Sequence, residues 1–256
     1  MPDLMIEGRH IGYGCNVDTI DVSKTVLLLI HGSGGDRGDW QWQLEGIKAP
    51  GGVIAIELPG HGESEGPGES SVPIYADWVA KFVLGLGLQR VALMGCSLGS
   101  AISQWICLER KPWVVALGLV GAGARLRVLP SLLDGLINEP ALSLNSLADF
   151  CLSRSATDSL RNEMKAKYQK ADPYIIHGDL SACDKFDVIN RIHEISVPTL
   201  ILVGAEDFLT PVKYSKFLND NIPGSTLVNI PNAGHLAMME KPEEFNAATQ
   251  NFLDSL

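Results

Sequence analysis

The stretch "VALMGCSLGSAIS", Val91 to Ser103, places a serine between two glycines where an apolar run ends and a helical pattern begins. Its centre, "GCSLG", is a G-x-S-x-G sequence, which positions a nucleophile when it joins a strand to a helix. The glycines permit a tight turn from which the Ser97 hydroxyl projects, and the amide groups that begin the helix face the same point. We therefore predict a nucleophilic Ser97; a serine in a purely structural turn is the alternative.

Apolar runs of strand length alternate with stretches of helical spacing on both sides of this turn. We expect strands at 25–30, 52–58, 90–95, 114–121, 199–204 and 225–230, and helices at 73–87, 98–110, 211–221 and 242–256. Continuous apolar strands that alternate with helices predict an α/β fold with a mostly parallel sheet covered on both faces. The alternating segment "MIEGRHIGYG" predicts an antiparallel strand or hairpin near the N-terminus.

One long interval, from about 124 to 194, contains no strand pattern and several amphipathic helical pieces. Such an interval is too long for an ordinary connection and is typical of a lid over an active site. We predict a helical cap at 124–189, inserted after the strand at 114–121, and a core made of 1–123 and 190–256. The alternative is an all-helical flank of the core.

Composition and charge exclude several classes of protein. The 256 residues carry 20 Lys and Arg against 30 Asp and Glu, a net charge of −10, and no basic run that could neutralise nucleic-acid phosphates. The longest apolar run, "TVLLLI", is far shorter than the about 20 residues of a membrane span. Five cysteines without a C-x-x-C pair favour free thiols, and the acidic N-terminus lacks the apolar core of a signal peptide. We expect a cytoplasmic protein that binds neither nucleic acid nor membrane; its oligomeric state stays open.

A serine hydroxyl needs a base, and six histidines are available. His235, in "PNAGHLA", follows the last strand and precedes the last helix, on the sheet edge where Ser97 is expected. We therefore predict His235 as the base. His31 and His61 lie on loops after strands, and surface or core roles suit the remaining three: His10, His177 and His193.

The base must be held by a carboxylate. "VGAEDFLTP" follows the strand at 199–204, and Asp207 fits better than Glu206 because Pro211 then begins the next helix. The order Ser97, Asp207, His235 is the one expected for this arrangement of strands.

Two backbone amides are candidates for an oxyanion hole. One is the N–H of Leu98, directly after the nucleophile. The other lies in the glycine-rich loop "HGSGGDRGDW", where the N–H of Ser33 is the first choice and Gly34 stands behind it. No phosphate-binding or complete dinucleotide motif is present. The spacing of His177, Asp179 and Asp184 suits no strong metal site, so we expect neither a cofactor nor a metal.

The segments "HGSGGD", "ELPGHGES", "GCSLGS", "VPTLILVGAEDFLTP" and "PNAGHLAMMEKPEEFN" together resemble the α/β-hydrolase superfamily, in particular its small lid-bearing esterases, thioesterases, lactonases and carbon–carbon bond hydrolases. The resemblance implies an eight-stranded, mostly parallel sheet with a helical cap over a pocket. It also implies the triad Ser97, Asp207 and His235, with Leu98 and the "HGSG" loop as the oxyanion hole. Cys96 and Ser100 depart from residues common in the family, but neither departure removes a catalytic group.

The function predicted first is a serine hydrolase that cleaves a small carboxylic ester or thioester through an acyl-enzyme. Carbon–carbon bond hydrolysis, lactone opening or perhydrolysis on the same triad is the second interpretation. The third is a small-molecule receptor that binds a ligand without turning it over.

Substrate contacts are less well defined by the sequence. Besides Gly34, Trp40 and Trp42 could border the pocket, with core packing as the alternative. Arg125 and Arg127 stand where the cap begins and could meet a substrate carboxylate or phosphate, with ordinary solvated arginines as the alternative.

Overall fold

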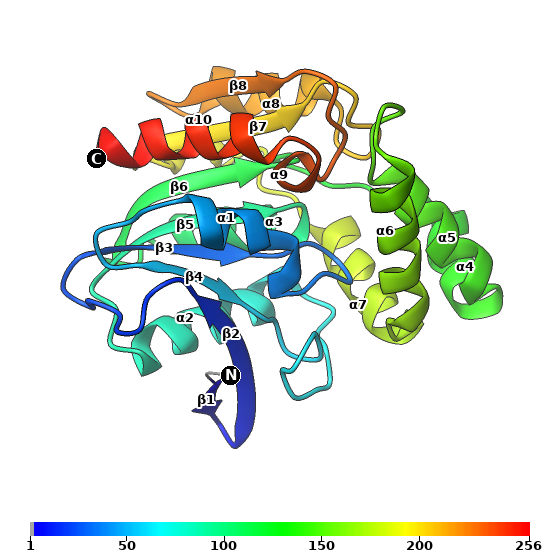
Figure 1. The fold of residues 1–256 in the computed structure, drawn as a ribbon, viewed down its shortest axis with the longest axis horizontal. Coiled ribbons are helices and arrows are strands. Elements are labelled where there is room, and N and C mark those ends of the chain that lie inside the picture. The colour runs from blue at the N-terminus through cyan, green and yellow to red at the C-terminus, as the bar shows by residue number, and fades with distance from the viewer. Residues whose placement is uncertain (1–2) are drawn as a thin grey trace.

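One sheet of eight strands organises the computed structural model, which describes residues 3–256 (Figure 1). Its strands are β1 (Asp3–Ile6), β2 (Arg9–Cys15), β3 (Thr25–Ile30), β4 (Val53–Ile56), β5 (Arg90–Cys96), β6 (Val114–Val120), β7 (Thr199–Gly204) and β8 (Thr226–Ile230). The spatial order is β1-β2-β4-β3-β5-β6-β7-β8, in which β2 pairs antiparallel with β1 and β4 and all other neighbours run parallel. The predicted sheet and its N-terminal hairpin are confirmed.

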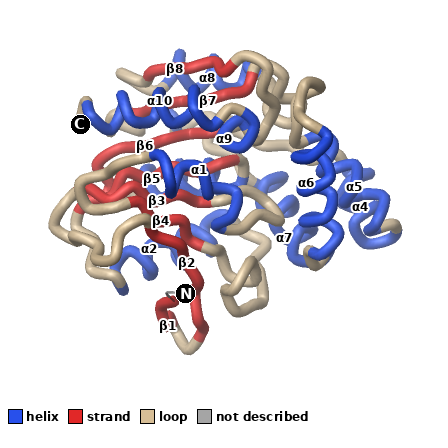
Figure 2. Tube along the Cα trace, in the orientation of Figure 1, coloured by secondary structure: helices blue, strands red, loops and turns tan. Residues whose placement is uncertain are grey.

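Helices cover both faces of this sheet (Figures 1 and 2). One face carries α2 (Val72–Gly85), α3 (Leu98–Leu108) and α8 (Val212–Asn221); the other carries α1 (Gln41–Gly46), α9 (Ala237–Glu240) and α10 (Pro242–Asp254). Two 3-10 turns, η1 (Arg37–Trp40) and η2 (Ile192–Glu194), complete the core. The short elements α1, α9, η1 and η2 were not predicted, because six or fewer residues are too few to show a helical period.

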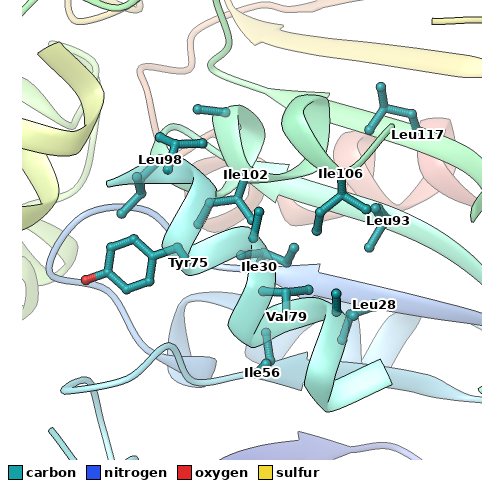
Figure 3. Packing of buried hydrophobic residues seen from close by; sticks show 14 of the residues in the cluster. Leu28, Ile30, Ile56, Tyr75, Val79, Leu93, Leu98, Ile102, Ile106 and Leu117 are labelled. Atoms are coloured by element: carbon teal, nitrogen blue, oxygen red, sulfur yellow. The ribbon is translucent and has the colours of Figure 1, made fainter. Parts of the chain in front are cut away.

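Two apolar clusters lie on the two faces of the sheet, and the central strand β3 contributes side chains to both. Leu28 and Ile30 enter the cluster under α2 and α3, whereas Leu27 and Leu29 enter the cluster on the opposite face. This alternation is the two-residue period of a strand, and it explains why "TVLLLI" is apolar throughout. Figure 3 shows the first cluster, with the Tyr75 ring at its edge and the Tyr75 hydroxyl pointing away from the aliphatic side chains.

Four helices follow β6 and precede β7: α4 (Pro130–Asn138), α5 (Pro140–Phe150), α6 (Asp158–Lys170) and α7 (Pro173–Lys185). They gather beside the carboxyl ends of the parallel strands (Figure 1), and we call these four helices the cap. A helical insertion after β6 is therefore confirmed, while the boundaries 124 and 189 stay a prediction. Where the chain enters and leaves the cap, Arg125 forms an isolated bridge and an ion pair with Asp187. Within residues 3–256 no helix is both long and apolar enough to cross a membrane.

Candidate active site

Ser97 occupies the turn between β5 and α3 in a strained conformation. Its φ of 53° and ψ of −114° lie outside the regions that residues with a Cβ favour. Two glycines make the turn possible, because a Cβ on Gly95 would overlap the Gly99 carbonyl and a Cβ on Gly99 would overlap the Ile30 carbonyl. The turn thus holds Ser97 at the end of the strand, directly before the first amide of α3.

Asp207 and His235 form a buried pair on the loops after β7 and β8. Their Oδ2 and Nδ1 atoms lie 2.8 Å apart, and Thr210 Oγ1 donates to the same Oδ2 at 2.7 Å. The N–H groups of Leu209 and Thr210 donate to Oδ1 at 2.9 and 2.8 Å. Burial alone would raise the pKa of Asp207, but the His235 ring and these hydrogen bonds outweigh it, so the pKa lies below its usual value. The carboxylate therefore accepts the Nδ1 proton and leaves Nε2 as the basic nitrogen.

His235 Nε2 is buried and has no hydrogen-bond partner among residues 3–256. His235 lines a cavity of about 40 Å³ together with Ser97. The structure therefore brings Asp207 and His235 into direct contact and places Ser97 in the same cavity, without a hydrogen bond between Ser97 and His235. Catalytic hydrogen bonds are often long before substrate binds, so this geometry leaves Ser97 a candidate.

We did not predict a role for Thr210 from the sequence. An Asp carboxylate that accepts hydrogen bonds from the amides two and three residues later forms a recurrent type of turn, and the segment from Asp207 to Pro211 forms such a turn.

The glycine-rich loop lies against the serine and contributes Gly32, Ser33 and Gly34 to the same cavity. A Cβ on Gly32 would sit 3.3 Å from the Ser97 Cβ, so the loop backbone closely approaches this side chain. Within residues 3–256 neither the Ser33 nor the Leu98 N–H has a hydrogen-bond acceptor. The Gly34 N–H differs, because it donates to Asp179 Oδ2 at 2.9 Å. Of the two loop amides considered, only that of Ser33 is open to a ligand.

Asp179, on cap helix α7, is a fully buried carboxylate that the sequence pattern did not single out as part of the site. Besides the Gly34 N–H, it accepts hydrogen bonds from His61 Nε2 at 2.9 Å and from the Tyr75 hydroxyl at 2.6 Å. His61 Nδ1 lies 3.1 Å from the Pro59 carbonyl oxygen, which can only accept. Both ring nitrogens face acceptors, which favours the imidazolium. Burial opposes its charge, but Asp179 and the carbonyl outweigh burial and raise the pKa of His61.

The remaining predicted contacts lie in different places. Trp40 is fully buried and packs against Phe245, with ring centroids 6.1 Å apart, so it belongs to the core rather than to the pocket. Arg125 is occupied by Asp187, whose Oδ2 accepts from its Nε at 2.6 Å. Arg127 is exposed, donates to the Asp184 carbonyl oxygen, and lines a second cavity that reaches Ser97.

That second cavity, which we call the groove, has a volume of about 580 Å³ and runs from Ser97 between the cap and the segment after Asp207. Among the described residues 3–256, its lining contains Arg127 and no carboxylate, and most of the other side chains are apolar. Four large apolar residues that are 52% to 70% exposed line it: Leu129, Leu142, Phe150 and Phe208. Large apolar side chains gathered around a concave surface indicate a site for an apolar ligand.

Comparison with known proteins agrees with this geometry. Residues 27–248 match the family described as "Alpha/beta hydrolase family". The chain is 26% identical over 259 residues to a pimeloyl-(acyl-carrier protein) methyl ester esterase of Neisseria meningitidis, covering 92% of this chain and 96% of that protein. It is 25% identical over 241 residues to 3-oxoadipate enol-lactonase 1 of Acinetobacter baylyi, covering 90% and 89%. The solved structure of a thermophilic esterase has a TM-score of 0.87 at 34% identity, covering 99% of this chain and 97% of that one.

Proposed function

This chain belongs to the alpha/beta hydrolase family, and we propose that it is a serine hydrolase that cleaves a small carboxylic ester or thioester through an acyl-enzyme. The observation that carries the proposal is the buried Asp207–His235 pair, whose free Nε2 lines one cavity with Ser97. A buried imidazole without a second partner has no structural role at Nε2, whereas a general base needs that nitrogen free.

In the proposed reaction, Ser97 Oγ attacks the substrate carbonyl carbon while His235 Nε2 takes the hydroxyl proton. Asp207 holds the Nδ1 proton and stabilises the imidazolium that forms. The N–H groups of Ser33 and Leu98 donate to the oxyanion of the tetrahedral intermediate. The imidazolium then protonates the departing alcohol or thiol, which leaves the acyl group on Ser97. A water molecule attacks the carbonyl carbon of this acyl-enzyme and gives a proton to His235 Nε2. The imidazolium returns that proton to Ser97 Oγ as the bond from Oγ to the acyl carbon breaks and the carboxylic acid leaves.

The buried thiols beside the site do not compete as nucleophiles. Burial is the main cause that raises the pKa of Cys151 and of Cys183 to about 12, and burial also raises the pKa of Cys96. A thiol that stays protonated at neutral pH reacts slowly.

The groove supports an acyl or alcohol group that is apolar for most of its length, because its walls are largely aliphatic and aromatic. Lactone opening is the second candidate, because it uses the same attack on a carbonyl and because one relative is an enol-lactonase. Carbon–carbon bond hydrolysis and perhydrolysis need no further residue of this site, and a substrate panel separates them from ester cleavage.

The first test is the intact mass of the protein after exposure to a fluorophosphonate. We expect one equivalent of label on the wild type and none on Ser97→Ala, followed by turnover of p-nitrophenyl esters or lactones. Ser97→Ala should lower kcat by about 10⁴ to 10⁶. Full turnover by Ser97→Ala would disprove the mechanism. Labelling without turnover of any ester, thioester or lactone would favour the receptor interpretation instead.

A further inference from the structure

We propose that Tyr168 and Asp179, from cap helices α6 and α7, are positioning residues that hold the Ser33 N–H in place as the oxyanion donor. They grip the two ends of one peptide group, the peptide that joins Ser33 to Gly34. The inference rests on the proposed function, and it gives the cap a part in catalysis besides enclosing the substrate.

One hydrogen bond is made at each end of this peptide, and we call these two hydrogen bonds the grip. The Tyr168 hydroxyl donates to the Ser33 carbonyl oxygen at 3.2 Å, and the Gly34 N–H donates to Asp179 Oδ2 at 2.9 Å. Because a peptide group is planar, anchors on its opposite edges restrain its rotation. The N–H that must face the oxyanion lies on the neighbouring peptide across the Ser33 α-carbon, so this restraint limits the backbone rotations that would turn the N–H away.

The loop packs directly against the cap at this point. Gly34 has a φ of +66°, and a Cβ there would lie 2.8 Å from Ile176 Cδ1 and 3.1 Å from Tyr168 Cε1. Position 34 therefore requires glycine for two reasons: its backbone has a left-handed conformation, and the loop closely approaches both cap helices, α6 and α7. Tyr168, Ser33 and Gly34 also share the cavity that Ser97 lines, so the grip lies at the reacting centre.

Asp179 is itself held by the core. Its Oδ2 lies 2.9 Å from His61 Nε2, and its Oδ1 accepts from Tyr75, whose pKa is raised first by burial and then by this carboxylate. A fully buried carboxylate is stable only when it is charge-paired and hydrogen-bonded, and here both oxygens are satisfied. The cap helix α7 is thereby locked to the loop that follows β4 and to α2, and the oxyanion loop is locked between them.

The test compares three single changes with a matched control. Tyr168→Phe removes the bond to the Ser33 carbonyl, and Asp179→Leu removes the acceptor of the Gly34 N–H. Asp179→Asn keeps an amide oxygen at that position and is the conservative rescue. Tyr174→Phe is the control, because it deletes an exposed tyrosine hydroxyl on the same cap helix α7 and leaves both bonds of the grip intact.

Each variant is assayed for kcat and KM on a p-nitrophenyl ester that the wild type turns over. It is also assayed for inhibition by a trifluoromethyl ketone that carries the same acyl group as this ester. The ketone forms an oxyanion on Ser97, whereas KM reports ground-state binding. Loss of one oxyanion donor costs about 10²- to 10³-fold in kcat, so displacing one should cost about 10- to 100-fold. We expect Tyr168→Phe and Asp179→Leu to lose about that much kcat and an equal factor of ketone affinity, with KM within about threefold.

Asp179→Asn should fall between Asp179→Leu and the wild type, and Tyr174→Phe should stay within about threefold of wild-type kcat. An unchanged kcat in Tyr168→Phe overturns the proposal, and so does a loss that appears only in KM or one that Tyr174→Phe shares. If Asp179→Leu fails to fold, which melting by circular dichroism reports, the single-hydroxyl change in Tyr168→Phe still decides. Failure of the proposed function looks different, because the wild-type Ser97 would then not react with the fluorophosphonate.

Discussion

The buried His31 ring predicts that this protein loses stability as the pH falls below about 6.5. Its Nδ1 donates to the Gly32 carbonyl oxygen at 2.8 Å, and its Nε2 accepts the Leu58 N–H at 3.0 Å. Protonating Nε2 would break the second bond and would place a charge beside His61, whose ring centroid is 4.9 Å away. Burial, and then the positive His61, lower the pKa of His31 from the usual 6.5 to about 3.

The direction and size of the effect follow from proton linkage. The unfolded chain binds the His31 proton more tightly than the folded protein does, so the stabilisation is complete above pH 6.5 and is lost as the pH falls from 6.5 toward 3. One pH unit in this window changes the free energy of unfolding by about 1.4 kcal/mol. Between pH 7.5 and 4.5 the loss is therefore about 2 to 3 kcal/mol, a sizeable part of the about 5 to 15 kcal/mol that holds a domain folded.

The assay is urea unfolding of the wild type and of His31→Gln at pH 7.5, 6.5, 5.5 and 4.5. Glutamine does not titrate, and its amide oxygen can accept the Leu58 N–H, so the variant keeps one of the two hydrogen bonds. We expect the variant to be less stable at pH 7.5, and the gap to shrink by about 2 to 3 kcal/mol at pH 4.5. The other acidic and basic groups titrate in both proteins and cancel in the difference. Two parallel stability curves would refute the reasoning.

Three further outcomes are expected. Asp207→Asn should lower kcat about 10⁴-fold by favouring the wrong tautomer of His235, with KM little changed, and steady-state kinetics measure both. Arg127→Gln should raise KM about two- to fivefold for an ester with a terminal carboxylate but not for a neutral ester of equal length. Arg125 already pairs with Asp187, so Arg125→Gln should leave the ratio of the two KM values unaltered. Gly95→Ala should cost at least about 3 kcal/mol or prevent folding, because its methyl group would overlap the facing carbonyl of α3, and an unchanged urea midpoint would contradict this.

The parts of the fold that the sequence predicted are those in which a local pattern is sufficient. Strand β3 is buried on both faces, so its residues Val26–Ile30 are all apolar and stand out from any neighbour. The turn at Ser97 could be predicted because close backbone contacts require glycine at positions 95 and 99, at a fixed spacing from the serine. The proximity of Asp207 and His235 could be predicted because each follows a predicted strand, and parallel strands bring their carboxyl ends to one edge of the sheet. Trp40 shows the limit of such reasoning, since an aromatic residue after a strand packs equally well in a core.

Asp179 could not be found in this way, because nothing in its neighbourhood along the chain distinguishes it. It lies on an amphipathic helix, where a carboxylate usually faces solvent. Its partners Gly34, Tyr75 and His61 are 145, 104 and 118 residues away, and only the docking of α7 on the core brings them together. The same docking brings Tyr168 to Ser33, 135 residues distant. The order of residues along the chain therefore predicts the proposed catalytic groups. The proposed positioning residues depend instead on how the cap packs, so we expect their substitution to change kcat without a contact to the substrate.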